Sequence, residues 1–102
     1  MNVIFDDDFE WDDTKDFDNQ DAHDGLTFEE ARLIWEENVY VLKDRRQYPE
    51  TRWLAFGYLD QTMLIVVFTK RGQRKRIISA READAHEEAK YGPRIRNSGR
   101  RR

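Results

Sequence analysis

The sequence predicts an α+β domain in which two N-terminal helices and one C-terminal helix pack on a four-stranded antiparallel sheet. Three features predict this fold. Apolar residues recur at helical spacing before residue 38, four strand-like segments follow between residues 39 and 81, and residues 82–91 have helix-forming composition. A chain of 102 residues suits one domain. We place it at residues 1–91 and expect the basic tail, residues 92–102, to be disordered.

The N-terminal third is expected to hold a short strand followed by the two helices. The first helix is predicted at residues 12–22, a polar stretch without Gly or Pro that starts with Asp12, a favourable residue at a helix N-terminus. The letters "HDG" end it. The second helix starts at Thr27, because Thr27 and Glu30 have the spacing of a capping box. Its apolar stripe consists of Phe28, Ala31, Ile34 and Trp35.

The remaining segments are expected to form the sheet and the last helix. The four strands are predicted at residues 39–44, 51–59, 62–70 and 75–81. The loop "RRQYPE", a turn at "DQ" and a Gly-containing turn at "RGQ" connect them. The third strand is apolar on both faces, which predicts a central position in the sheet.

Composition excludes several classes of protein and of site. The chain has no Cys and only two His, which argues against disulfides and against thiolate or histidine zinc sites. No apolar run approaches the roughly 18 residues of a membrane span. The acidic, aromatic start is unlike a signal peptide. We therefore expect a cytoplasmic protein that needs no metal or other cofactor and does not contact a membrane.

The net charge of −3 hides a strong asymmetry along the chain. Residues 1–30 contain twelve Asp and Glu but only one basic residue, Lys15, whereas residues 31–102 contain seventeen Lys and Arg against nine Asp and Glu. This distribution indicates either two different partners or one polyanion that approaches from a defined side. A solvated acidic helix and a basic tail would explain it equally well.

Five stretches in fixed order resemble the BrnT family of type II toxins. They are "FEWDDTK" with the following Asn19 and His23, "LTFEEA", "ETRWLAFGYL", "LIVVFTKRG" and "RIISAREA". The resemblance implies a RelE-like fold and metal-independent ribonuclease activity. It also implies a BrnA-like antitoxin with a ribbon-helix-helix DNA-binding part, through which alone the toxin would reach operator DNA. Two features depart from the family: "AHDGL" replaces a turn like Lys-His-Gly, and the first helix is more acidic.

Metal-free RNA cleavage needs a group that takes the 2′-hydroxyl proton, a group that protonates the leaving oxygen, and fixed positive charge at the phosphate. Arginine suits the last task because its planar fork binds two phosphate oxygens. Regular alternation in residues 75–81 puts Ile77, Ser79 and Arg81 on one face and Arg76, Ile78 and Ala80 on the other. Either face therefore carries an arginine onto the sheet.

Glu50 and Arg52 share a face if both lie in the second strand, and the resemblance implicates this acidic-x-Arg pair in toxicity. We expect Arg52 and Arg81 to converge with a nearby carboxylate on an anion-binding patch, with Arg76 and Ser79 as further candidates. Structural roles are open for each residue. Arg81 could form a strand-end salt bridge with Glu82 or Glu50, Glu50 could be a plain loop carboxylate, Arg76 could only cover apolar surface, and Ser79 could be only a small residue.

Two further groups are candidates for substrate contact. Lys15, Asn19 and His23 recur every four residues on one helical face, which would align a cation, an amide and a titratable imidazole toward a phosphate. The alternative is that Lys15 pairs with nearby acids and His23 caps the helix. In the loop, Tyr48 with Arg45 and Arg46 forms a basic-aromatic cluster suited to RNA bases. A mobile loop without function is the alternative there.

The function predicted from these features is a toxin-type endoribonuclease that an antitoxin neutralises. A second hypothesis is a catalytically weak or inactive relative that acts as a protein-interaction module and corepressor. The acidic N-terminal segment favours it, because that segment would repel RNA at close range. A third hypothesis is a nucleic-acid-binding domain that uses the basic tail.

Overall fold

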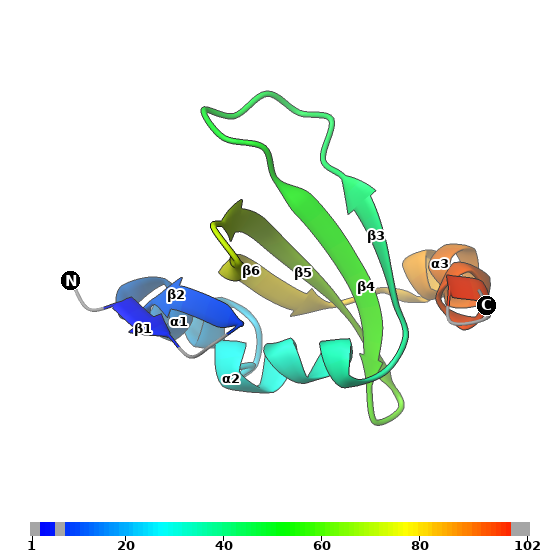
Figure 1. The fold of residues 1–102 in the computed structure, drawn as a ribbon. Helices are drawn as coiled ribbons and strands as arrows, with labels where there is room; N and C mark the ends of the chain where they lie inside the picture. The colour runs from blue at the N-terminus through cyan, green and yellow to red at the C-terminus, as the bar shows by residue number, and fades with distance from the viewer. Residues whose placement is uncertain (1–2, 6–7, 99–102) are drawn as a thin grey trace.

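The computed structural model describes residues 3–5 and 8–98, which form an α+β domain with three helices and a mixed sheet (Figure 1). Five strands lie side by side in the order β2-β6-β5-β4-β3, and the three-residue strand β1 extends the sheet beyond β2. The strands are β1 (Val3–Phe5), β2 (Phe9–Asp12), β3 (Val39–Lys43), β4 (Trp53–Leu59), β5 (Thr62–Arg71) and β6 (Arg74–Glu82).

The helices begin where the sequence supplies side chains that cap them. Helix α1 (Asp13–Ala22) starts after Asp12, whose carboxylate accepts hydrogen bonds from the backbone N–H groups of Thr14 and Lys15. Helix α2 (Phe28–Ala31) has the predicted capping box and continues as the 3₁₀ helix η1 (Arg32–Glu36). Helix α3 (Ala85–Ser98) starts after Asp84, whose carboxylate accepts a hydrogen bond from the backbone N–H of Glu87.

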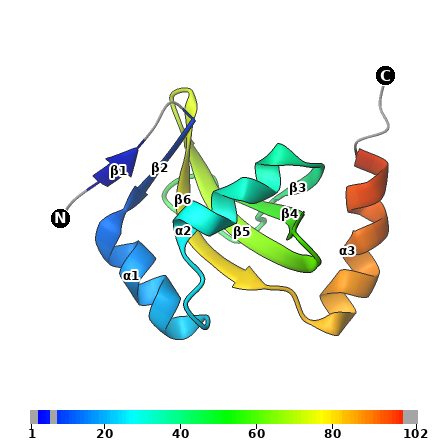
Figure 2. The same ribbon diagram turned by 90° about the horizontal axis from the view of Figure 1, so that it is seen from below.

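The helices cover the two faces of the sheet unequally (Figure 2). On one face, here called the α2 face, side chains of β2, β4, β5 and β6 pack against Phe28, Ala31 and Ile34. On the other, the α3 face, Phe56, Met63 and Ile65 pack against Tyr91 and Ile95 of α3. Helix α3 contacts β3 and β4. The β5–β6 hairpin end of the α3 face therefore lies beyond the helix.

The sheet differs from the prediction at its N-terminal edge. The predicted antiparallel order of the last four strands is confirmed, with β6, β5, β4 and β3 as successive neighbours. The prediction of a purely antiparallel four-stranded sheet is wrong, because β2 pairs with β6 in parallel. β2 is only four residues long and leads directly into α1, so its sequence shows little strand periodicity.

The C-terminal segment also differs from the prediction. Residues 92–98 were expected to belong to a disordered tail, but they are the second half of α3. Burial explains this order, since Ile95 is packed against β4 and β5 residues and Gly92 lets the helix approach the Tyr58 hydroxyl closely. Tertiary packing thus stabilises a helix despite Pro93. The remaining tail, residues 99–102, lies outside the described residues.

Candidate functional site

A row of polar side chains crosses the α3 face near the β5–β6 hairpin. Thr69 of β5 lies opposite Arg76 of β6, and Arg76 lies opposite Glu10 of β2. Arg52 immediately precedes Trp53, whose pairing with Phe68 ends the β4–β5 ladder, so Arg52 lies one residue beyond the ladder, on the side of Thr69. Because directly opposite residues share a face, Arg52, Thr69, Arg76 and Glu10 form one line, here called the polar row.

A β-bulge in β6 puts Arg76 into this row. Val67 is opposite Ser79 but Phe68 is opposite Ile77, so Ile78 has no counterpart on β5. Ile77 and Ala80 are consequently both buried in the α2-face core although they are three residues apart. The predicted alternation is therefore wrong, and Arg76 shares the α3 face with Ser79 and Arg81. The sequence could not reveal this, because the bulge depends on the partner strand.

Arg52 is held by an aromatic ring. Its guanidinium carbon lies 4.1 Å from the centroid of the Tyr48 ring, and that of Arg46 lies 5.6 Å from the same centroid. The Nε atom of Arg52 and the hydroxyl of Thr69 are both buried, and neither has a hydrogen-bond partner within residues 3–5 and 8–98. Buried donors of this kind are uncommon in folded proteins. The Nε–H group of Arg52 and the hydroxyl of Thr69 are neighbours in the polar row, and each can still donate a hydrogen bond to an oxyanion.

Arg76 is paired more tightly than Arg52. Its Nη1 donates to Glu10 Oε2 at 2.9 Å, and only 17% of the Arg76 side chain and 12% of the Glu10 side chain are exposed. A pair this well shielded keeps the arginine in place, since separating the charges would leave one of them poorly solvated. The ion pair therefore fixes a positive group beside Thr69 and lowers the net charge that Arg76 presents.

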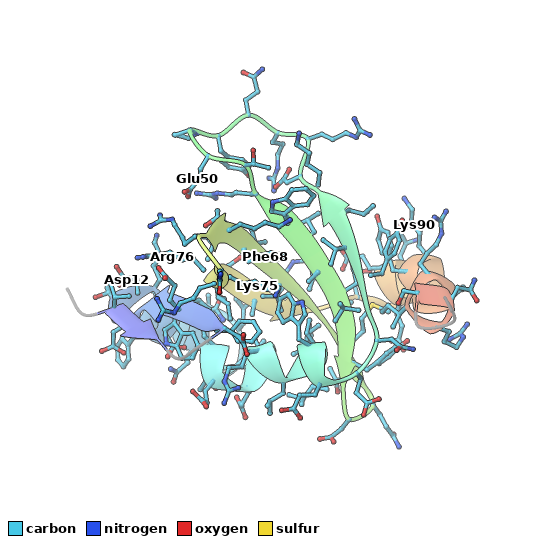
Figure 3. The ribbon with its side chains drawn as sticks, viewed as in Figure 1. Asp12, Glu50, Phe68, Lys75, Arg76 and Lys90 are labelled. Carbon is cyan, nitrogen blue, oxygen red and sulfur yellow. The ribbon has the colours of Figure 1, made fainter. Side chains whose placement is uncertain are left out.

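The β3–β4 loop borders the polar row. Residues 43–51 line a hollow of about 490 Å³ that includes the predicted binding residues Arg45, Arg46 and Tyr48. Hydrogen bonds from Arg46 lower the pKa of the Asp44 carboxyl below its usual value and fix the start of the loop. Glu50 pairs with Arg71 of the hairpin at 3.4 Å, so it lies at the same end of the sheet as Arg76 (Figure 3).

Glu50 and Arg52 do not lie within β4, which begins at Trp53, so the expected strand geometry for this pair is wrong. They lie at the junction of loop and strand instead. The nearby hairpin makes this end of the molecule strongly basic. Residues 43–53 and 70–76 contain nine Lys and Arg against two Asp and Glu. The basic residues are Lys43, Arg45, Arg46, Arg52, Lys70, Arg71, Arg74, Lys75 and Arg76.

Arg81 shares a face with Arg52 but does not converge with it. It lies opposite Ile65, four residues along β5 from Thr69, which corresponds to roughly 13 Å. Both terminal nitrogens of Arg81 donate to Glu87 of α3, at 2.9 and 2.8 Å. These hydrogen bonds lower the pKa of Glu87 to about 2. The contacts match the alternative role of a strand-end salt bridge, with Glu87 in place of Glu82 or Glu50.

Two residues of the predicted row on α1, Asn19 and His23, have structural roles. Asn19 is buried, accepts a hydrogen bond from the Ala80 backbone N–H at 3.0 Å, and donates to the Leu26 carbonyl at 3.2 Å. The pairing of β2 with β6 ends at Ile77. Beyond this point, Asn19 accepts the hydrogen bond that a neighbouring strand would otherwise accept from β6. Lys15 and Ser79 line a shallow hollow beside it. His23 lies one helical turn beyond Asn19 and is the C-cap residue of α1. This position matches its alternative role as a helix cap.

No helix among the described residues is long and apolar enough to cross a membrane. A family model described as "Ribonuclease toxin, BrnT, of type II toxin-antitoxin system" matches residues 11–87. The chain belongs to the BrnT family. The match begins within β2 and ends in the first turn of α3, so it includes every residue of the polar row except Glu10. A comparison with curated proteins finds no match.

Two members of the polar row were missed by sequence reasoning. The sequence pattern around Thr69 predicts only a central strand, although a hydroxyl between apolar residues and a run of cations is a usable signal of a site. Glu10 offered no such signal, because its contact with Arg76 joins residues 66 positions apart. In this BrnT chain, the site is therefore assembled largely by long-range strand pairing.

Proposed function

We propose that the chain is a metal-independent endoribonuclease toxin that cleaves RNA, in particular messenger RNA, by attack of the 2′-hydroxyl on the adjacent phosphate. The observation that carries this proposal is the polar row, where a fixed guanidinium and an unpaired buried hydroxyl adjoin at the most basic end of the molecule. Membership in a family of type II ribonuclease toxins supports the same reading.

In this proposal, Arg52 supplies the charge that the phosphorane needs. Its fork donates to phosphate oxygens, the Thr69 hydroxyl donates to one of them, and Tyr48 keeps the guanidinium oriented. Arg76 adds positive potential from beside Thr69, while Glu10 keeps it in position. Arg45 and Arg46 attract neighbouring phosphates toward the loop hollow.

The proton transfer from the 2′-hydroxyl is assigned to a carboxylate. Glu50 is the carboxylate closest to Arg52 in sequence, and release from Arg71 would leave it able to accept the 2′-hydroxyl proton. His23 and Lys15 lie along α1, on the side of β6 away from β5. We therefore assign Glu50, rather than His23, as the general base, and a water molecule supplies the proton that the leaving 5′-oxygen takes up.

The proposed neutralising partner is a BrnA-like ribbon-helix-helix antitoxin that covers the basic end and blocks the access of RNA, in the cytoplasm. Operator DNA is contacted only through this antitoxin. The alternative remains an inactive relative that acts as a corepressor module. It is favoured by one specific observation: α1 and its flanks carry a dense set of acids beside β6, which would repel RNA that approaches the polar row.

Expression of the lone chain in bacteria separates the two proposals. Arg52→Ala should relieve growth arrest and reduce cleavage of RNA by the purified protein about 10²- to 10³-fold, as loss of a transition-state donor does. Arg96→Ala on α3 is the matched control and should retain activity. Thermal unfolding verifies that both variants fold. If the unaltered chain neither arrests growth nor cleaves RNA but binds a ribbon-helix-helix protein tightly, the corepressor proposal replaces the ribonuclease.

A further inference from the structure

Strand β3 is an open edge of the sheet. Among the described strands it has a neighbour on one side only, β4. Val41 at its centre is 39% exposed, and the five-residue strand contains neither Pro nor a bulge that would hinder further pairing. Beside the edge, Val39, Tyr40 and Val41 line a hollow of about 510 Å³ together with the end of α3. The edge is therefore approachable.

The hydrogen-bond pattern shows which residues face outward. The Asp44 backbone N–H donates to the Arg52 carbonyl at 2.9 Å, so residues 44 and 52 are a hydrogen-bonded pair of the antiparallel ladder. Such pairs alternate, so residues 42 and 40 also bond to β4. Val39, Val41 and Lys43 consequently direct their backbone N–H and C=O groups away from the sheet. Any added strand must bond to these three residues.

We propose that β3 pairs with β3 of a second copy of the chain, antiparallel and centred on Val41, so that the two copies form one continuous sheet. In this register Val41 faces its own equivalent, and Val39 of each copy faces Lys43 of the other. All three outward-facing residues are then hydrogen-bonded, which is the isologous contact expected of a two-fold dimer.

The charges flanking β3 favour this register. Glu37, which has extended backbone, comes before the strand, and Arg45 follows it. Pairing centred on Val41 sets Glu37 of each copy opposite Arg45 of the other. Pairing centred one residue earlier would set Glu37 opposite Lys43 but would also place Asp44 opposite Glu36, so a repulsive pair would offset the attractive one. Opposite charges across a strand pair stabilise it, whereas like charges destabilise it.

Engineered cysteines test the register directly, because the chain has none of its own. Val41→Cys should form a covalent dimer on mild oxidation, since directly opposite hydrogen-bonded residues have Cα atoms about 5.5 Å apart, within disulfide range. Lys43→Cys is the matched control: the two altered positions would lie roughly 13 Å apart and should not cross-link. Equal cross-linking of both variants would overturn the proposal.

Mass measurements on the full chain test whether the dimer forms at all. Sedimentation should give about twice the 12.3 kDa of one chain, with a shift to the monomer on dilution. Val41→Pro removes an outward N–H without breaking the ladder to β4, and it should yield monomers that keep their circular dichroism spectrum. A chain that stays monomeric throughout, yet loses binding of an antitoxin through Val41→Pro, would assign this edge to another partner and refute the dimer.

A charge exchange distinguishes this contact from unspecific association. Glu37→Arg and Arg45→Glu should each weaken self-association by about tenfold, because each change sets like charges opposite one another twice per dimer. A mixture of the two variants should restore dimers, since the altered charges are complementary between unlike copies. Failure of the mixture to associate better than either variant would contradict the proposed pairing.

Discussion

At the scale of single residues, the polar side chains of this domain divide into those that hold the fold and those that remain available. Asn19 belongs to the first group, because both ends of its amide are bound to backbone groups. Arg76 is held by Glu10. Arg52 and Thr69 belong to the second group, since each keeps a buried polar atom without a partner in the described part of the chain. Such a division indicates where a ligand that reaches these buried atoms would gain hydrogen bonds.

Replacement of Asn19 should destabilise the domain without touching the polar row. Asn19→Ala leaves the Ala80 N–H and the Leu26 carbonyl without their partner, which we expect to cost about 1–3 kcal/mol in the free energy of unfolding. Urea denaturation measures this loss. Gln20→Ala, one position along the same helix, is the control and should change stability by less than about 0.5 kcal/mol. Similar midpoints for both variants would show that the amide does not anchor β6.

At the scale of elements, helix α3 is attached to the sheet by two different means. Its apolar residues Tyr91 and Ile95 pack on the α3 face, and Glu87 binds Arg81 at the end of β6. The second contact is electrostatic and depends on pH. Because the pKa of Glu87 is lowered from 4.5 to about 2, the folded state favours its ionised form.

Stability should therefore fall in acid through this carboxylate. The contribution of Glu87 is fully present above about pH 4.5 and is lost as the pH falls toward 2. We expect up to about 1 kcal/mol, since Arg81 is half open to solvent. Unfolding free energies measured across this window should vary less for Glu87→Gln than for the parent. Glu88→Gln, whose carboxylate accepts from Tyr58 rather than from an arginine, is the control. Parallel pH curves for parent and Glu87→Gln would contradict this.

The elements also show how far the sequence predicts the structure. The capping box at Thr27 and the four antiparallel strands follow from local spacing, and both are confirmed. The β2–β6 pairing, the bulge at Ile78 and the extension of α3 through Ser98 depend on contacts between distant segments. For the same reason the basic end could be anticipated from composition, whereas the position of Thr69 and Arg76 near Arg52 could not.

At the scale of the whole molecule, charge is distributed between two regions. The hairpin and the β3–β4 loop concentrate nine basic residues, while α1 and its flanks carry most of the acids of the N-terminal third. A polyanion would thus be drawn to one end and repelled along β6. With RNA as the proposed substrate, this asymmetry would direct the strand across the polar row rather than along the neighbouring helix.

RNA binding should accordingly be steeply dependent on salt. For a single strand, the slope of log K against log salt concentration falls by roughly 0.7 for each phosphate contact removed. Arg45→Gln in the loop should reduce the slope by about this amount, whereas Lys90→Gln on α3 should leave it unchanged (Figure 3). Binding of a non-cleavable RNA at several salt concentrations provides the measurement. Equal slopes for both variants would place the RNA elsewhere.

The bulge at Ile78 has a consequence for the length of the chain. Ile78 is the one residue of its strand without a counterpart on β5, so its removal would leave Arg76, Ile77, Ser79 and Ala80 each on the side they already occupy. Deletion of a residue from β5 would instead move every following side chain of that strand to the opposite face of the sheet. We therefore expect related chains to tolerate deletion of the residue at the position of Ile78. A one-residue deletion in the interior of a sheet ordinarily disrupts the fold.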